Sequence, residues 1–184
     1  MLGIDDGPFT WEDQQADVVG VLMRGPSYIE AVMRTRVAVD GDDATQALAA
    51  MVLRSRYREQ PSVLMLDGVN VGGFNVVDLD ALRQACEVPV MTVTRDEPDH
   101  AAIEAALRKH FPDAERRLAL LHRHTTHRVA TDHNPLWVKV VGMGLEDAKD
   151  IVRANTVRGA LPEPVRVAHL IAAAMRFGES RGRA

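Results

Sequence analysis

The chain has 184 residues, of which 46% are hydrophobic and 26% are charged, a composition that is ordinary for a soluble globular domain. Its formal net charge of −4 excludes a strongly basic surface, so any binding to nucleic acid must rest on a local patch. The single cysteine, Cys86, excludes an internal disulfide and a thiolate zinc cluster, and its helical surroundings predict a core position.

The first third of the chain is predicted to be strands. Residues 1–6, 17–23 and 28–39 are rich in apolar and β-branched residues, and polar turns separate them. Successive strands with short connections are typical of an antiparallel meander. We therefore expect three neighbouring strands that pair in chain order.

Strands and helices alternate after residue 42. Asp42 to Thr45 supplies helix-capping residues, and Pro98 is expected in the first turn of its helix. Such alternation implies parallel strands joined by right-handed crossovers. The expected strands are 62–66, 90–93 and 136–141, and the expected helices begin near residues 44, 78, 98, 144 and 165, with one further helix around residues 118–121.

A meander followed by βαβ units predicts an α/β fold, namely a mixed sheet with helices on both faces in the ribonuclease H-like arrangement. The sequence contains no repeat, linker or domain boundary, so residues 1–184 are expected to form one domain. It also contains no signal-peptide pattern and no apolar run of transmembrane length. We expect a cytoplasmic protein without a membrane partner.

Acidic residues stand at the ends of two predicted strands. Asp5 or Asp6 ends the first strand, and Asp67 ends the apolar run 63–66. Magnesium prefers hard oxygen ligands, and carboxylates on adjacent strands can share an ion. Each acid can equally be a turn former or a helix cap, and for Asp42 and Asp43 the cap is the favoured interpretation.

A glycine-rich turn, residues 68–75, follows Asp67 directly. Glycine lets the backbone approach a ligand, yet the same turn can simply be a tight connection into the helix at Asp78. It contains neither the dinucleotide-binding glycine pattern nor a phosphate-binding loop.

Histidines and arginines share one segment, with His122, His124 and His127 between Arg116 and Arg128. The spacing is not that of a helical zinc site. We favour a solvated basic stretch over a metal site, and such a stretch could contact a phosphate backbone. The sequence offers no serine-nucleophile motif.

Four segments together resemble the largely archaeal endonuclease dU family, formerly a domain of unknown function and a distant relative of endonuclease V. The resemblance covers essentially the whole chain. The segments that carry it are Gly3-Ile4-Asp5-Asp6-Gly7-Pro8-Phe9, Val39 to Thr45, Gly73 to Asp78, and Leu161-Pro162-Glu163-Pro164-Val165-Arg166-Val167-Ala168-His169.

The resemblance to endonuclease V implies roles for particular residues. Gly3-Ile4-Asp5 and Leu66-Asp67-Gly68 are similar to its two acid motifs, which makes Asp5 and Asp67 metal ligands. Arg95 stands where that family has a catalytic-site lysine. Pro26, Tyr28 and Ile29 resemble the wedge that separates strands, and the turn at Gly72, Gly73, Phe74 and Asn75 would receive the displaced base.

The chain also departs from endonuclease V. Val37 follows Arg36 where that family has a glutamate ligand, so Asp6, Asp40 or Asp43 is left to complete the metal site. The predicted wedge segment lacks the second proline of the Pro-Tyr-Ile-Pro wedge of endonuclease V. Gly72 to Asn75 replace a Pro-Arg loop, so inosine specificity does not follow.

The resemblance implies an Mg²⁺- or Mn²⁺-dependent endonuclease that cuts DNA near deaminated bases, deoxyuridine or inosine, in DNA repair. Asp5, Asp67 and Arg95 would be its catalytic residues. The alternative is a non-catalytic nucleic-acid-binding or regulatory protein on the same fold. A small-molecule phosphohydrolase is a weaker third interpretation, and it predicts a closed pocket in place of an open groove.

Overall fold

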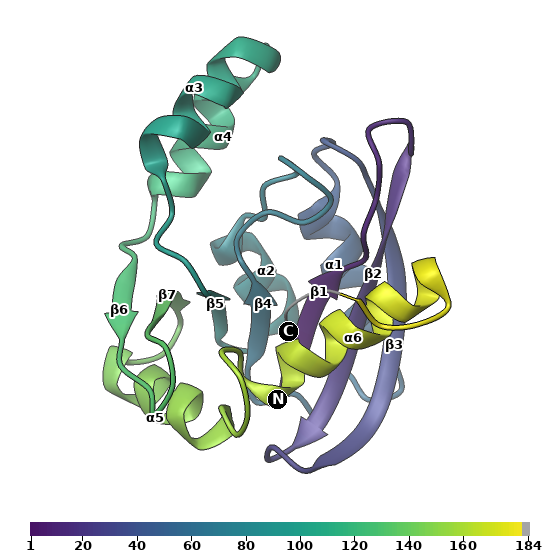
Figure 1. Cartoon of the computed structure of the whole chain (residues 1–184), viewed down its shortest axis with the longest axis vertical. Helices are drawn as coiled ribbons and strands as arrows, with labels where there is room; N and C mark the ends of the chain where they lie inside the picture. The colour runs from purple at the N-terminus through teal and green to yellow at the C-terminus, as the bar shows by residue number, and fades with distance from the viewer. Residues whose placement is uncertain (182–184) are drawn as a thin grey trace.

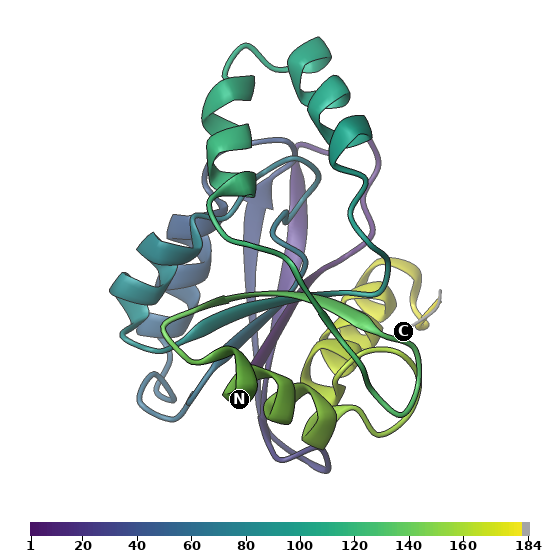
Figure 2. The same cartoon turned by 90° about the vertical axis from the view of Figure 1, so that its left-hand side faces the viewer.

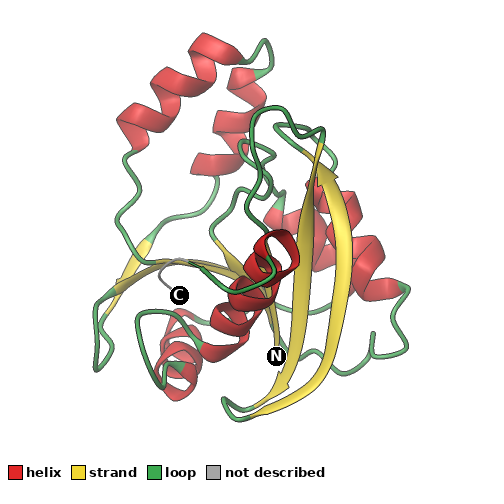
Figure 3. Cartoon of the chain, turned by 45° about the vertical axis from the view of Figure 1, so that its right-hand side comes forward, coloured by secondary structure: helices red, strands yellow, loops and turns green. Residues whose placement is uncertain are grey.

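The computed structural model describes residues 1–181. In this part of the chain, a seven-stranded mixed sheet carries helices on both faces (Figures 1 and 3). The strand order is β3-β2-β1-β4-β5-β7-β6. The elements in chain order are β1 (Leu2–Asp6), β2 (Gln15–Arg24), β3 (Tyr28–Ala38), α1 (Ala44–Leu53), β4 (Leu64–Asp67), α2 (Leu79–Cys86), β5 (Val90–Thr94), α3 (His100–His110), α4 (Ala114–His122), β6 (His127–Val129), β7 (Leu136–Val141), α5 (Leu145–Asn155) and α6 (Glu163–Phe177).

The expected α/β fold is confirmed. Strands β1, β2 and β3 form the antiparallel meander, and β1, β4 and β5 are parallel neighbours. The expectation of parallel pairing fails only at β7, which is antiparallel to β5. The reason is that β6 and β7 form a hairpin, so β7 enters the sheet at the edge where β5 ends.

Two local predictions needed correction. The strand β6 was not expected, because its three residues, two of them His127 and Arg128, show no apolar alternation. Helix α3 begins at His100, after Asp99, whose side chain accepts a hydrogen bond from the Ala102 N–H. Pro98 therefore precedes the capping residue instead of standing in the first turn.

The core lies on both faces of the sheet. Side chains alternate along each strand, so Leu64 and Leu66 pack towards α1 and α2, whereas Met65 packs towards α5 and α6. Cys86 is buried in the first of these layers, as expected. The strand residues that precede the acids at the ends of β1 and β4 are therefore buried in the core.

Helices α3 and α4 form a hairpin that lies beyond the carboxyl edge of the parallel strands (Figure 2). The buried guanidinium of Arg117 ties it to the rest of the protein by donating to the carbonyls of Gly41 and Phe74. Among the described helices, none combines the length and apolar character that crossing a membrane requires.

Candidate metal centre

The two strand-end acids lie side by side at the carboxyl edge of the sheet. Strands β1 and β4 pair in parallel, with Gly3 opposite Met65 and Ile4 opposite Leu66, so the next positions in register are Asp5 and Asp67. The expected adjacency of these strands is confirmed. By alternation, both carboxylates belong to the face that α6 covers.

Helix α6 can approach Asp5 because a glycine lies two positions before it, within β1, and another two positions after it, just past the end of β1. A Cβ on Gly3 would overlap the backbone carbonyl of Pro164, at the start of α6. A Cβ on Gly7 would lie 3.2 Å from the carbonyl oxygen of Ala172. The helix therefore lies directly on β1, and His169, between these two contacts, meets Asp5.

His169 completes a group of three possible metal ligands. Its Nδ1 lies 2.8 Å from Oδ2 of Asp5. Asp5, Asp67 and His169 each offer one ligand atom, and these atoms lie within 4.8 Å of one another. Within residues 1–181, no other group of three histidine, cysteine or acidic side chains is arranged in this way.

Burial gives this group unusual electrostatics. Burial and the neighbouring charge of Asp5 raise the pKa of Asp67 to about 7. Burial likewise raises the pKa of Asp5, while the hydrogen bond to Asp5 raises the pKa of His169. Carboxylates crowded together away from water are unfavourable when both are charged, and a bound cation relieves that cost.

Arg95 follows β5 at the same edge. Its positive charge lowers the pKa of Asp5 and Asp67, which opposes part of the rise that burial causes. It also acts on His169. The structure thus places Arg95 within electrostatic reach of these three side chains, and its catalytic role stays a prediction.

The remaining predicted metal ligands lie outside the group of three. Asp6 belongs to the opposite face of β1 and accepts a hydrogen bond from the Gly72 N–H, 3.1 Å away. Burial and the charge of Asp5 raise the pKa of Asp6 to about 7. Asp40 accepts from the Phe74 N–H, and Asp43 accepts from the Ala38 N–H. Metal binding by these three acids stays a prediction.

Asn75 is a structural member of the glycine turn. Its side chain is fully buried. Its Oδ1 accepts from the Ala44 N–H at the start of α1, and its Nδ2 donates to Ala38 and Asp43. The amide that was expected to contact a base is thus engaged within the protein, and Asn75 caps α1 in the place expected of Asp43, whose side chain makes no cap hydrogen bond.

The turn also forms one wall of an aromatic pocket of about 410 Å³. Phe74 and Phe111 meet edge to face, with ring centroids 5.5 Å apart. Gly72 and Gly73 adopt φ values of 68° and 85°, which favour glycine, and this conformation presents Phe74 to the pocket. Trp11, Asp40 and His110 complete the lining.

The predicted wedge lies elsewhere. Pro26 is in the turn between β2 and β3, next to the exposed side chains of Tyr28 and Ile29. Asp5 pairs with Val19 of β2, whereas Tyr28 pairs with Arg24, five positions further along the strand. The separation along the strand is about 17 Å. A strand-separating role stays a prediction, and it would need a duplex that extends along the meander.

Sequence reasoning missed His169 as a site residue. The only signal was its place at the end of the segment Leu161–His169, which contributed to the family resemblance but carried no role. Within that segment Arg166 pairs with Glu163 at 2.7 Å at the start of α6, whereas His169 lies against Asp5.

Comparisons with known proteins identify relatives of this chain. A family model described as "Endonuclease dU" matches residues 1–176. A "UPF0215 protein" from Methanothermobacter thermautotrophicus is 43% identical, with all of this chain and 91% of the relative covered. A crystal structure of a protein of unknown function from Archaeoglobus fulgidus is 34% identical, with a TM-score of 0.85 over 95% of this chain and 96% of that one.

A more distant solved structure shares the fold. It is endonuclease V from Ciona intestinalis, in complex with a DNA that contains an inosine followed by a ribo-adenosine. That protein is 14% identical, with a TM-score of 0.60 over 91% of this chain and 81% of that one. At this identity the similarity establishes the fold alone.

Proposed function

This chain belongs to the endonuclease dU family, and we propose that it is a metal-dependent endonuclease that hydrolyses phosphodiester bonds in DNA near deaminated bases. Deoxyuridine and inosine are the candidate lesions, and DNA repair is the corresponding process. The similarity of the fold to endonuclease V, which was solved with inosine-containing DNA, supports DNA as the partner.

The observation that carries the proposal is the group Asp5, Asp67 and His169 at the sheet edge. Two carboxylates and an imidazole fit a divalent cation, with Mg²⁺ or Mn²⁺ favoured by the hard oxygen ligands. The Nε2 atom of His169 is buried without a hydrogen-bond partner in the described residues, and such an atom suits a ligand. Burial and the charge of Asp5 raise the pKa of Asp67 to about 7, and a bound cation would stabilise its charged form.

A divalent ion at this site would activate water and neutralise charge on the phosphate. The residues of the chain supply its surroundings. Asp5 holds the His169 ring through Nδ1, which fixes the orientation of the imidazole. Arg95, whose charge reaches the same carboxylates, would stabilise negative charge that develops on the phosphate.

The aromatic pocket beside the glycine turn suits a displaced base. Phe74, Phe111 and Trp11 offer ring faces or edges, and the carboxylate of Asp40 can accept an N–H from a base edge. The turn is linked to the acid site because Asp6, the neighbour of Asp5, binds the Gly72 N–H. A base bound in this pocket would therefore be recognised close to the phosphodiester bond that is cleaved.

A cleavage assay tests the proposal. Duplexes with one deoxyuridine, one deoxyinosine or no lesion are incubated with the protein and Mg²⁺ or Mn²⁺, and the products are separated by length. Cleavage that needs the lesion and the metal, and that Asp67→Asn abolishes, supports the proposal. The exposed Asp132→Asn is the matched control. Absence of cleavage under all these conditions, or equal cleavage by Asp67→Asn, overturns it.

The second candidate is a non-catalytic protein that binds nucleic acid on the same fold. One observation favours it. The carboxylates of Asp40 and Asp43 accept hydrogen bonds from backbone N–H groups, so the group of possible metal ligands contains two carboxylates and lacks the third that was expected to complete the metal site. Metal-independent binding of the lesion duplex without cleavage would identify this alternative.

A further inference from the structure

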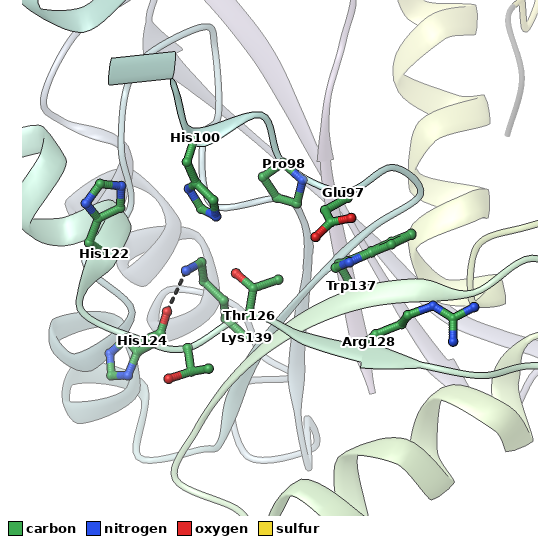
Figure 4. A pocket seen from close by; sticks show the side chains of 10 residues that line it. Glu97, Pro98, His100, His122, His124, Thr126, Arg128, Trp137 and Lys139 are labelled. Atoms are coloured by element: carbon green, nitrogen blue, oxygen red, sulfur yellow. Dashed lines mark hydrogen bonds between the residues drawn. The ribbon is translucent and has the colours of Figure 1, made fainter. Parts of the chain in front are cut away.

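Figure 4 shows a second pocket. Residues of β6 and β7 line it, and in the order of the sheet these strands lie beyond β5 from β1 and β4. It encloses about 470 Å³ between the loop that follows β5, the start of α3, the end of α4, and strands β6 and β7. Its lining includes three histidines, Arg128 and Lys139, with Glu97 as the acidic member. Neither the metal centre nor the aromatic pocket includes any of these residues.

Lys139 gives the pocket a buried positive charge. It is a β7 residue that is only 7% exposed, and its Nζ donates to the carbonyls of Leu121 and His124 at 2.9 and 2.6 Å. Burial lowers the pKa of Lys139. Carbonyls compensate an ammonium only in part, so an anion in the pocket would stabilise it further.

Histidines and a hydroxyl stand around this charge. The rings of His100 and His122 meet edge to face, with centroids 5.4 Å apart. Figure 4 shows the Lys139 ammonium directed towards the space below His100. Thr126 also lines the pocket, and its Oγ1 is buried without a hydrogen-bond partner in the described chain. An unsatisfied hydroxyl beside a buried cation points to a ligand with acceptor oxygens.

The other end of the pocket is aromatic. Trp137 stands opposite Arg128 in the pairing of β6 and β7, and Glu97 lies next to Trp137 in Figure 4. A tryptophan face stacks on a nucleobase, and a carboxylate accepts an N–H from a base edge such as that of cytosine. One end of the pocket therefore suits a phosphate, and the other suits a base.

The pocket also lies on the same edge of the sheet as the acids. Asp67 pairs with Val93 of β5, Val93 pairs with Val138 of β7, and Trp137 is the residue before Val138. Two strand spacings, ~10 Å, thus separate the acid site from the wall of the pocket. Side chains alternate along β7, so Trp137 and Lys139 point to the opposite face from Val138 and from the acid site. A strand that reaches both sites must therefore pass over the edge from one face to the other.

We propose that this pocket binds one nucleotide of a nucleic-acid strand, with its phosphate near Lys139 and His100 and its base against Trp137. The assignment of that strand as the substrate rests on the proposed function. In that assignment, the bound nucleotide flanks the one held at the acid site, and the pocket fixes the position of the strand.

Fluorescence gives a local test that needs no cleavage. The chain has two tryptophans, Trp11 and Trp137, so Trp11→Phe leaves Trp137 as the reporter of the pocket. A short oligodeoxycytidylate is titrated in the presence of EDTA, with cytidine as the probe that lacks phosphate. Saturable quenching by the oligonucleotide at concentrations where cytidine has no effect supports the proposal. Unchanged Trp137 fluorescence, while anisotropy shows that the labelled oligonucleotide is bound, overturns it.

Variants test the two ends separately. His100→Gln and Trp137→Leu should weaken oligonucleotide binding, measured by anisotropy in EDTA, by about fivefold and about tenfold respectively. Arg58→Gln, an exposed arginine beyond the opposite edge of the sheet, is the control and should leave the affinity unchanged. If both His100→Gln and Trp137→Leu bind the oligonucleotide with the affinity of the wild type, as the control does, the proposal is overturned.

The outcomes separate this inference from the proposed function. Binding that depends on the pocket, without cleavage of any duplex, would remove the nuclease assignment and keep the nucleotide site. Lesion-dependent cleavage that is unchanged, in both rate and KM, by His100→Gln and Trp137→Leu would keep the nuclease and overturn the nucleotide site.

Discussion

Asp5 and His169 are 164 positions apart in the chain, yet Oδ2 of the first lies 2.8 Å from Nδ1 of the second. The contact exists because α6 lies directly on β1, where Gly3 and Gly7 leave room for its backbone. It converts two acids at a sheet edge into a group with three different ligand atoms. The packing of the last helix on the first strand is therefore what builds the site.

Metal binding should stabilise the folded protein. An ion that binds only the folded state raises the free energy of unfolding by about 2.7 kcal/mol at roughly a hundredfold excess over Kd. We expect Mg²⁺ or Mn²⁺ to raise the Tm of the wild type, measured by differential scanning calorimetry. Asp67→Asn and His169→Gln should remove most of this rise.

The exposed Asp132→Asn is the control for this experiment, because it removes one carboxylate away from the three ligands. It should keep the full metal-dependent rise in Tm. If His169→Gln keeps the same rise as this control, then the imidazole does not hold the ion.

The carboxylates should make the metal-free protein less stable as the pH rises. Burial and the charge of Asp5 raise the pKa of Asp6 to about 7 in the folded protein, from its ordinary value of 3.8. Below pH 4 both states are protonated, and between pH 4 and pH 7 the folded state keeps a proton that the unfolded state has lost. The free energy of unfolding therefore falls across this range and stays low above it.

Asp6→Asn removes this cost and retains an oxygen for the Gly72 N–H. We expect little change in the free energy of unfolding at pH 4 and a gain at pH 8 of at most about 4 kcal/mol, the value of a three-unit shift. Urea unfolding in EDTA at both pH values measures it. An equal effect at pH 4 and pH 8 would show that the charge of Asp6 is not the cause.

The sequence predicted the parts of this site that depend on short-range patterns. An apolar run that ends in an acid identifies a strand end, so Asp5 and Asp67 could be placed at one edge. A meander followed by a crossover allows the first and fourth strands to be neighbours, and the structure pairs them. His169 could not be placed in the same way, since a helix position meets a strand only through tertiary packing.

The role of Asp40 was also beyond pattern reasoning. Acids in a row between a strand and a helix resemble a ligand set, and Asp40 and Asp43 were expected to compete for one place. In the structure, Asp40 adopts a left-handed conformation with φ of 57° and binds the Phe74 N–H. The backbone N–H groups of the glycine turn need hydrogen-bond acceptors, and only the folded conformation of the turn shows which acid supplies them.

Gly3→Ala should separate α6 from β1. The added methyl group would overlap the Pro164 carbonyl, and backbone cannot move aside as a flexible side chain can. We expect a loss of about 3 kcal/mol in the free energy of unfolding, at the upper end of the cost of overpacking. The folded fraction should also bind Mn²⁺ more weakly, because His169 moves with the helix.

Gly25→Ala is the matched control. Gly25 has φ of 60°, and no atom lies within 4 Å of an added Cβ, so only backbone strain of about 1 kcal/mol is expected. Urea unfolding and Mn²⁺ titration measure both variants. A loss no larger in Gly3→Ala than in Gly25→Ala would show that the close contact is not required.

Phe74→Ala should weaken discrimination between damaged and normal DNA. Phe74 lines the aromatic pocket against Phe111, and its removal opens the wall where a displaced base would stack. Loss of one stacking contact costs about 1–3 kcal/mol. We therefore expect kcat/KM on a lesion duplex to fall by about tenfold or more, while the metal-dependent rise in Tm is unchanged because the three ligands are intact. Tyr28→Ala, measured beside it, compares the predicted wedge with the pocket. If cleavage near the lesion needs Tyr28 and tolerates Phe74→Ala, then the base is recognised at the β2–β3 turn and not at the glycine turn.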